Sequence, residues 1–283
     1  MPKIANYNQI EAHNRGNAVY EMFANGPYIQ EHVKRSGNII SGMYGEANRR
    51  KYELNPESRF PSTREQSVAE HEHEAVDLFF DIRDIYGDEV FGGIDLLLLV
   101  EILHRHDAGE AVHGDIPDDG SQRQESANDD ENEFMDKNIY NNIEVYGTGA
   151  AHANELRSGH IAMEHKSSLL GIVAKLIDKT VAVLYDLKAQ ESGHGGDLKN
   201  KKNLSDLDKL SIKITGSTRV ADVWLCSSLL GHPELMTIPL TLVCFEIIQA
   251  ASIRVRGEKM AWLNDFLVEW LLNGETFTLT LKA

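Results

Sequence analysis

Apolar residues recur three and four positions apart over much of this chain, which is the spacing of amphipathic helices. Residues 10–24 suit a helix, and Ser67 with Glu70 forms a capping box that predicts a second helix ending near residue 86. Residues 91–105 are apolar nearly all round and predict a buried helix. Only residues 276–281 alternate as a short strand would. We therefore expect an all-α fold.

The remaining helical segments are separated by a loop and by a polar insert. The loop is expected over residues 112–126 and the flexible insert over residues 192–204, which include three glycines. Further helices are expected over residues 135–146, 153–190, 220–230, 235–253 and 258–272. We expect an N-terminal helical or irregular segment, a metal-binding core, the insert and a C-terminal helical extension packed on the core: residues 1–54, 55–191, 192–204 and 205–283.

Composition narrows the class of protein. The formal net charge of the 283 residues is −16, which disfavours polynucleotide binding, because such binding relies on neutralised phosphates. The most apolar stretch, residues 94–100, is far shorter than the ~20 residues of a membrane span. Cys226 and Cys244 are expected as buried free thiols, so we predict a cytoplasmic protein. The acidic stretch 115–136 is expected to be a solvated loop.

Ionisable residues stand at positions that the apolar pattern predicts to be buried. His71 shares a helical stripe with Ala75 and Phe79, so it should face the interior, whereas His73 should point away. His106 and Asp107 end the apolar segment 91–105. Buried polar groups are costly unless they are bound, and a metal ion is the usual reason for them.

A third helix carries a carboxylate in apolar surroundings. Asp178 lies beside Ala174, Val181 and Ala182 in the expected helix 153–190. Together with His71 and the pair at 106 and 107, it would provide two imidazoles and two carboxylates, which suit Mn, Fe, Co or Zn. The alternative is a set of hydrogen-bonded core histidines and a buried aspartate paired with a base.

Four short strings in the same region carry a resemblance to a known family. They are Ser67-Val68-Ala69-Glu70-His71, His106-Asp107-Ala108-Gly109-Glu110, Gly114-Asp115-Ile116-Pro117 and Lys175-Leu176-Ile177-Asp178. These strings resemble the HD-domain superfamily of metal-dependent phosphohydrolases, and most of all its 5'-deoxynucleotidase branch. The resemblance covers roughly residues 55–190 and implies an HD-domain helical bundle, with extra C-terminal helices here.

The resemblance implies a role for each candidate site residue. The metal ligands would be His71, His106, Asp107 and Asp178, holding one divalent ion (Mn, Co, Fe, Zn or Mg). The catalytic acids would be Glu110 and Asp115, and the phosphate-binding residues Arg59 and Arg64, although the spacing around these arginines departs from that of the family. The implied substrate is a small phosphorylated molecule, a (deoxy)nucleoside monophosphate, and the implied assembly is a homodimer.

The sequence is also compatible with three other functions. The enzyme could hydrolyse nucleoside triphosphates. It could be an oxygenase with two irons, the second held by His152, His160 and His165. It could also be a non-catalytic regulatory protein on an HD-type frame, since the acidic segment and the C-terminal helices have no counterpart in the resemblance.

Overall fold

The computed structural model describes residues 9–24, 68–111, 125–191, 206–232, 235 and 238–265. These residues form helices and no strand, so the predicted all-α class is confirmed. The helices, with two short 3₁₀ segments (η2 and η3) and a π-helical turn (η4), are α1 Gln9–Ala24, α4 Val68–Tyr86, η2 Asp88–Phe91, α5 Leu96–Leu103, η3 Ala108–Ala111, α6 Glu125–Met135, η4 Asp136–Tyr140, α7 Asn141–Tyr146, α8 Ala150–His165, α9 Leu169–Glu191, α10 Asp206–Thr215, α11 Val220–Gly231 and α12 Pro239–Arg256.

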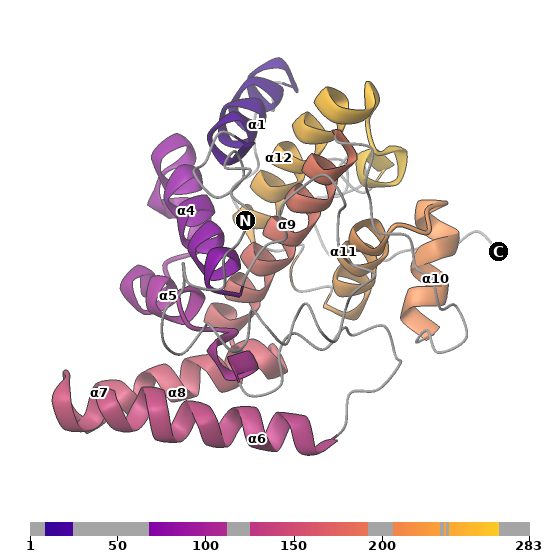
Figure 1. The fold of residues 1–283 in the computed structure, drawn as a ribbon. Coiled ribbons are helices and arrows are strands. Elements are labelled where there is room, and N and C mark those ends of the chain that lie inside the picture. Colours follow the sequence, from indigo (N-terminus) through magenta and orange to yellow (C-terminus); the bar gives the residue numbers. More distant parts are fainter. Residues whose placement is uncertain are drawn as a thin grey trace.

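Helix α9 runs through the middle of the molecule (Figure 1) and packs against α4, α5, α8, α11 and α12. Its inward residues Val173, Ile177, Val181 and Leu184 are completely buried. They follow helical spacing, so their burial removes a continuous apolar stripe from water. Asp178 lies on the same helix and is thereby carried into the interior of the fold.

The prediction of a single helix over residues 153–190 is wrong, because the structure has two helices, α8 and α9, joined by a tight turn. Lys166 ends α8 in the left-handed conformation, with φ of 49°. The hydroxyl of Ser168 then accepts a hydrogen bond from the backbone N–H of Gly171 at 3.1 Å. This is the action of an N-cap residue, and it starts α9 at Leu169.

The buried helix expected over residues 91–105 is shorter than predicted. Gly92 and Gly93 both have positive φ, and the side chain of Asp95 caps α5 through the N–H groups of Leu97 and Leu98. The helix ends at Leu103, so the residues at 106 and 107 lie in the following turn and not on the helix itself. The prediction that this helix is buried on all its faces is also wrong, since the Leu97 side chain is 79% exposed.

The acidic segment also differs from its predicted structure. Residues 125–135 form helix α6 and not a solvated loop, and this helix packs on η3, directly after the 106–107 turn. A Cβ built on Gly109 would lie 3.0 Å from the Cβ of Glu131, so the two segments approach closely there. Helix α10 lies within the predicted C-terminal helical extension, although no separate helix was expected at its position.

The C-terminal helices complete the packing around α9. Helix α12 buries residues 240–252 against the rest of the chain, so an interface between copies is not needed to cover this apolar stretch. Both cysteines are buried free thiols, as expected. None of the described helices combines the length and the apolar composition that a membrane span requires. The possible strand 276–281 lies outside the described residues.

Candidate metal centre

His71 lies in the first turn of α4 and faces the interior, as its apolar stripe predicts. Ala75 and Phe79, on the same stripe, are 0% and 1% exposed, and His71 itself is 8% exposed. Its Nε2 lies 3.0 Å from Oδ1 of Asp178 on α9. The histidine is therefore held between two helices and directed at a buried carboxylate.

His106 approaches the same carboxylate from the turn after α5. Its Nδ1 donates a hydrogen bond to the carbonyl oxygen of Leu103 at 2.8 Å, which leaves a lone pair on Nε2 in the neutral ring. This Nε2 is buried and makes no hydrogen bond among the described residues. It lies 3.7 Å from Oδ1 of Asp178 and 3.3 Å from Oδ2 of Asp107. When the ring loses its second proton, this buried nitrogen can offer its lone pair to a metal ion.

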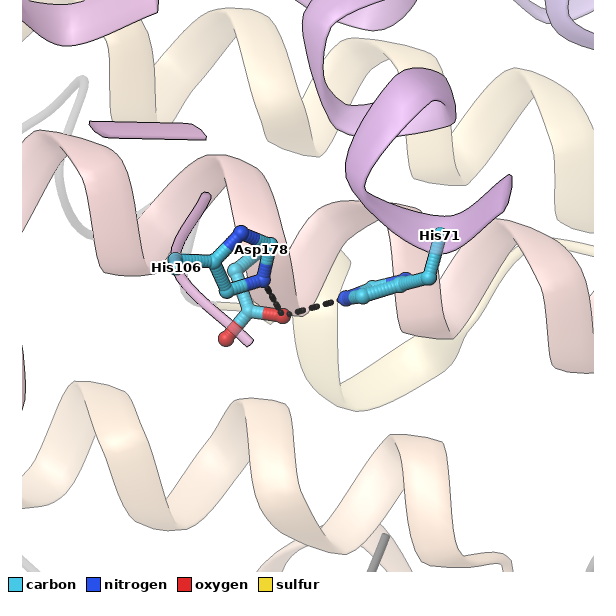
Figure 2. A group of neighbouring side chains, drawn as sticks. All are labelled: His71, His106 and Asp178. Atoms are coloured by element: carbon cyan, nitrogen blue, oxygen red, sulfur yellow. Dashed lines mark hydrogen bonds and ion pairs between the residues drawn. The ribbon is translucent and has the colours of Figure 1, made fainter. Parts of the chain in front are cut away.

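The two oxygens of Asp178 face different partners. Figure 2 shows Oδ1 between the rings of His71 and His106, with both dashed lines meeting on this one oxygen. The other oxygen, Oδ2, lies 3.0 Å from Nζ of Lys175 and 3.7 Å from Nζ of Lys179. The lysines fix the carboxylate from behind, so the orientation of Oδ1 is determined before any ligand binds.

Together these atoms have the composition of a divalent metal site. One ligand atom each from His71, His106 and Asp178 lies within 4.8 Å of the other two, and no other group of this kind occurs in the described part of the chain. Oδ2 of Asp107 is 3.7 Å from Nε2 of His71 and completes a set of two imidazoles and two carboxylates. Such a mixed nitrogen and oxygen set suits Mn²⁺, Fe²⁺, Co²⁺ or Zn²⁺.

The charges in this cluster are strongly coupled. Burial lowers the pKa of His106, but the carboxylates of Asp107 and Asp178 outweigh it and hold the pKa well above 6.5. Burial raises the pKa of Asp107, yet His106 and His71 bring it below its ordinary value. Lys175 and Lys179 likewise outweigh burial and keep the pKa of Asp178 well below 3.8. Both carboxylates are thus ionised, and an incoming metal ion must displace the proton of His106.

Glu72 supports the site and was missed from the sequence. Its side chain is fully buried, and Oε1 accepts a hydrogen bond from the backbone N–H of Asp107 at 3.1 Å. This contact ties the 106–107 turn to α4, next to His71. In the sequence nothing distinguishes Glu72 from other acids on the helix, because its partner is 35 positions away and only the fold reveals it.

The remaining site candidates are only partly covered by the structure. Glu110 is half-buried in η3, and its N–H donates to the carbonyl oxygen of Asp107 at 2.9 Å, so it follows the ligand turn directly. Asp115, Arg59 and Arg64 lie outside the described residues, and their roles stay predictions.

The extra histidines do not gather into a second cluster among the described residues. His152 pairs with Glu101 at 3.1 Å, and His165 is exposed. The ring of His160 is buried between the hydroxyl of Tyr140 at Nδ1 and the carbonyl oxygen of Ile102 at Nε2. His73 is half-buried and lies edge-on to His104, with ring centroids 4.9 Å apart.

His160 makes stability depend on pH. Burial, assisted by the nearby His106, lowers the pKa of His160 to about 4, whereas the unfolded value is 6.5. Between these values the unfolded chain binds the proton and the folded chain does not, so stability falls as pH decreases from 6.5 towards 4. We expect a loss of roughly 2 to 3 kcal/mol from this group, since each pKa unit corresponds to about 1.4 kcal/mol.

Urea unfolding at pH 7 and pH 4.5 measures this contribution. The loss between the two pH values should be smaller in His160→Gln by roughly 2 to 3 kcal/mol. His165→Gln removes an exposed histidine and should keep the wild-type pH dependence. Equal losses in wild type and His160→Gln would show that His160 does not titrate in this range.

Comparisons with known proteins add no further information on the site. The chain matches no family model, and neither the curated proteins nor the solved structures contain a significant match. A function can therefore be inferred only from the geometry of the metal centre and from the sequence strings.

Proposed function

We propose that the protein is a metal-dependent phosphohydrolase that removes the 5'-phosphate from (deoxy)nucleoside monophosphates. The observation that carries this proposal is the convergence of His71, His106 and Asp178 within 4.8 Å, with Asp107 beside them. The choice of a phosphate ester rests on the resemblance of the strings that contain these residues to HD-domain phosphohydrolases.

In this proposal, the chain holds one divalent ion through His71, His106, Asp107 and Asp178. When bound, such an ion supplies a Lewis acid that increases the acidity of water and polarises a phosphoryl group. Lys175 and Lys179 keep Asp178 ionised and oriented, and Glu72 keeps the backbone of Asp107 in place. Outer contacts of this kind orient the ligands and tune their basicity.

Proton transfer is assigned to the two acids after the ligand turn. Glu110 and Asp115 would divide the work, one accepting a proton from the attacking water and the other donating a proton to the departing 5'-oxygen. Glu110 is suited to this by its position, because its backbone is hydrogen-bonded to Asp107 and its side chain is half-buried.

The proposal is tested with the purified full chain, Mn²⁺ or Co²⁺, and a panel of nucleotides. We expect inorganic phosphate to be released from nucleoside 5'-monophosphates. Glu110→Gln should reduce the rate by about 100-fold or more at saturating metal, which is the usual contribution of a general acid or base. Glu144→Gln, which removes an exposed acid on α7, is the matched control and should keep the wild-type rate.

Each outcome of this assay has a clear meaning. Release of triphosphate or diphosphate in place of phosphate would indicate a triphosphate hydrolase. No release from any nucleotide would refute the proposal, and an unchanged rate in Glu110→Gln would remove this residue from the mechanism.

A further inference from the structure

Helix α5 ends directly before the turn that carries two of the candidate ligands, and side chains bind the carbonyl groups at this end. The last four carbonyls of a helix have no partner within the helix itself. In α5, the guanidinium group of Arg105 donates to the carbonyl oxygen of Glu101 at 3.1 Å, and Nδ1 of His106 donates to that of Leu103 at 2.8 Å. The orientation of the His106 ring therefore depends on where the end of α5 lies.

The carbonyl between these two, that of Ile102, is bound from another helix. The backbone N–H of Arg105 donates to it at 3.0 Å, and Nε2 of His160, on α8, lies 3.4 Å from it at hydrogen-bonding geometry. A Cβ built on Gly159 would collide with Cδ1 of Ile102, so α8 approaches α5 closely at this residue. Helix α8 thus holds the end of α5 one residue before the carbonyl that orients His106.

Tyr140 determines which nitrogen of His160 carries the proton. A carbonyl oxygen can only accept, so Nε2 of His160 must donate to Ile102. Burial lowers the pKa of His160 and keeps the ring neutral near pH 7, so the other nitrogen, Nδ1, is an acceptor. The hydroxyl of Tyr140 is hydrogen-bonded to this Nδ1, and burial raises the pKa of Tyr140, so the hydroxyl keeps the proton that it donates. The two bonds together select one tautomer of His160.

The position of Tyr140 depends on the π-helical turn η4, which joins α6 to α7 and buries this tyrosine. Such turns are rare and recur at functional sites. Arg157, on α8, binds the turn at both of its ends. Its Nε donates to Oδ1 of Asp136 at 2.7 Å, and its guanidinium group lies over the Tyr140 ring, 4.9 Å from the centroid. The tyrosine hydroxyl is therefore held against α8, where His160 lies.

We propose that Tyr140 and His160 are positioning residues of the metal centre. Tyr140 fixes the tautomer of His160, and His160 fixes the carbonyl end of α5. The turn that starts at this end then directs Nε2 of His106 at Asp178. Partners outside the ligands themselves orient the ligands and influence the affinity of a metal site. This inference deepens the proposed function and rests on its metal centre, but it does not depend on which reaction the ion serves.

The test is calorimetric titration of the EDTA-treated, dialysed full chain with Mn²⁺. Tyr140→Phe removes only the hydroxyl, and His160→Leu removes both ring nitrogens while keeping an apolar side chain. Each should weaken Mn²⁺ binding about tenfold, the lower end of the range for partners that contact a ligand directly. Tyr86→Phe is the matched control, because this hydroxyl also donates to a side chain, Oε2 of Glu246 at 2.8 Å, but lies at the opposite end of α4 from His71. The control should bind Mn²⁺ as wild type does.

The visible absorption spectrum of bound Co²⁺ gives a second readout, which a loss of stability alone would not change. Tyr140→Phe and His160→Leu should alter the position or intensity of the Co²⁺ bands, because the direction of a ligand changes, and Tyr86→Phe should leave them unaltered. The thermal midpoint of each metal-free variant shows whether it is folded. Tyr140→Phe, the smaller change, decides the outcome if His160→Leu does not fold.

The outcomes separate this inference from the proposed reaction. Mn²⁺ affinities of Tyr140→Phe and His160→Leu within about twofold of wild type would overturn the inference, given the size of such effects in metal sites. An equal loss in Tyr86→Phe, or the absence of Mn²⁺ binding by wild type, would also overturn it. Weaker binding in the two variants but not in the control, together with no phosphate release from any nucleotide, would refute the proposed reaction and support the positioning role.

Discussion

We expect His106→Gln to abolish phosphate release by the metal-loaded protein. The Nε2 of His106 is the buried nitrogen directed at Asp178 and Asp107, and glutamine removes it. Loss of an outer contact to a metal ligand typically costs 10- to 100-fold, so loss of a ligand should cost roughly 1,000-fold or more. The rate of phosphate release from a nucleoside monophosphate with Mn²⁺ measures the effect.

Glutamine is chosen because it is close to histidine in length but has neither ring nitrogen, so the ligand nitrogen and the Nδ1 contact with the carbonyl oxygen of Leu103 are both removed. His165→Gln makes the same exchange at an exposed position on α8 and should keep the wild-type rate. A rate within about threefold of wild type in His106→Gln would be inconsistent with a ligand role, given the size of ligand effects.

The second large effect concerns the packing of α8 on α9. A Cβ on Gly171 would lie 2.2 Å from the carbonyl oxygen of Ala162 and 2.7 Å from the backbone N of Met163. Backbone atoms cannot move aside as a side chain can, so the two helices would have to separate. Because overpacking costs 1–3 kcal/mol even where side chains yield, Gly171→Ala should lower the free energy of unfolding by about 3 kcal/mol or more.

Urea unfolding measures this effect, and Gly231→Ala provides the matched control. There the added Cβ would meet only Leu207 Cδ1 at 3.5 Å, an ordinary contact. The control should be neutral or slightly stabilising, because alanine is the better helix former. If Gly171→Ala were as stable as Gly231→Ala, the close approach of α8 to α9 would be incorrect.

The helices that carry the candidate ligands could be predicted because their apolar stripes are strong. The spacing of Ala75 and Phe79 predicted the inward direction of His71, and Val181 with Ala174 predicted the burial of Asp178. A helix that buries one face shows this in its own sequence. That two helices and a turn would bring these side chains to one point could be expected only from the mismatch between ionisable residues and their buried positions; the sequence suggested three helices, but His106 and Asp107 lie in the turn after α5.

The breaks between helices could not be predicted in the same way. The apolar pattern continues from α8 into Leu169 and Leu170, so it does not show the turn at residues 166–168. Lysine has no preference for the left-handed conformation that Lys166 adopts, and Ser168 was not recognised as a cap. Helix α6 is polar along most of its length, and it packs on η3, a short segment that no pattern in the sequence predicts.

The contacts around the ligands depend on tertiary structure and were also beyond prediction. Glu72 meets the N–H of Asp107, which is 35 positions away, and no periodicity indicates that partner.

The central claim is that these side chains bind a divalent cation, and calorimetric titration of the EDTA-treated, dialysed full chain with Mn²⁺ tests it most directly. We predict one ion per chain for wild type and for His165→Gln, and no measurable binding for His106→Gln. No uptake of Mn²⁺, Co²⁺, Fe²⁺, Zn²⁺ or Mg²⁺ by wild type, or equal uptake by His106→Gln, would contradict the account.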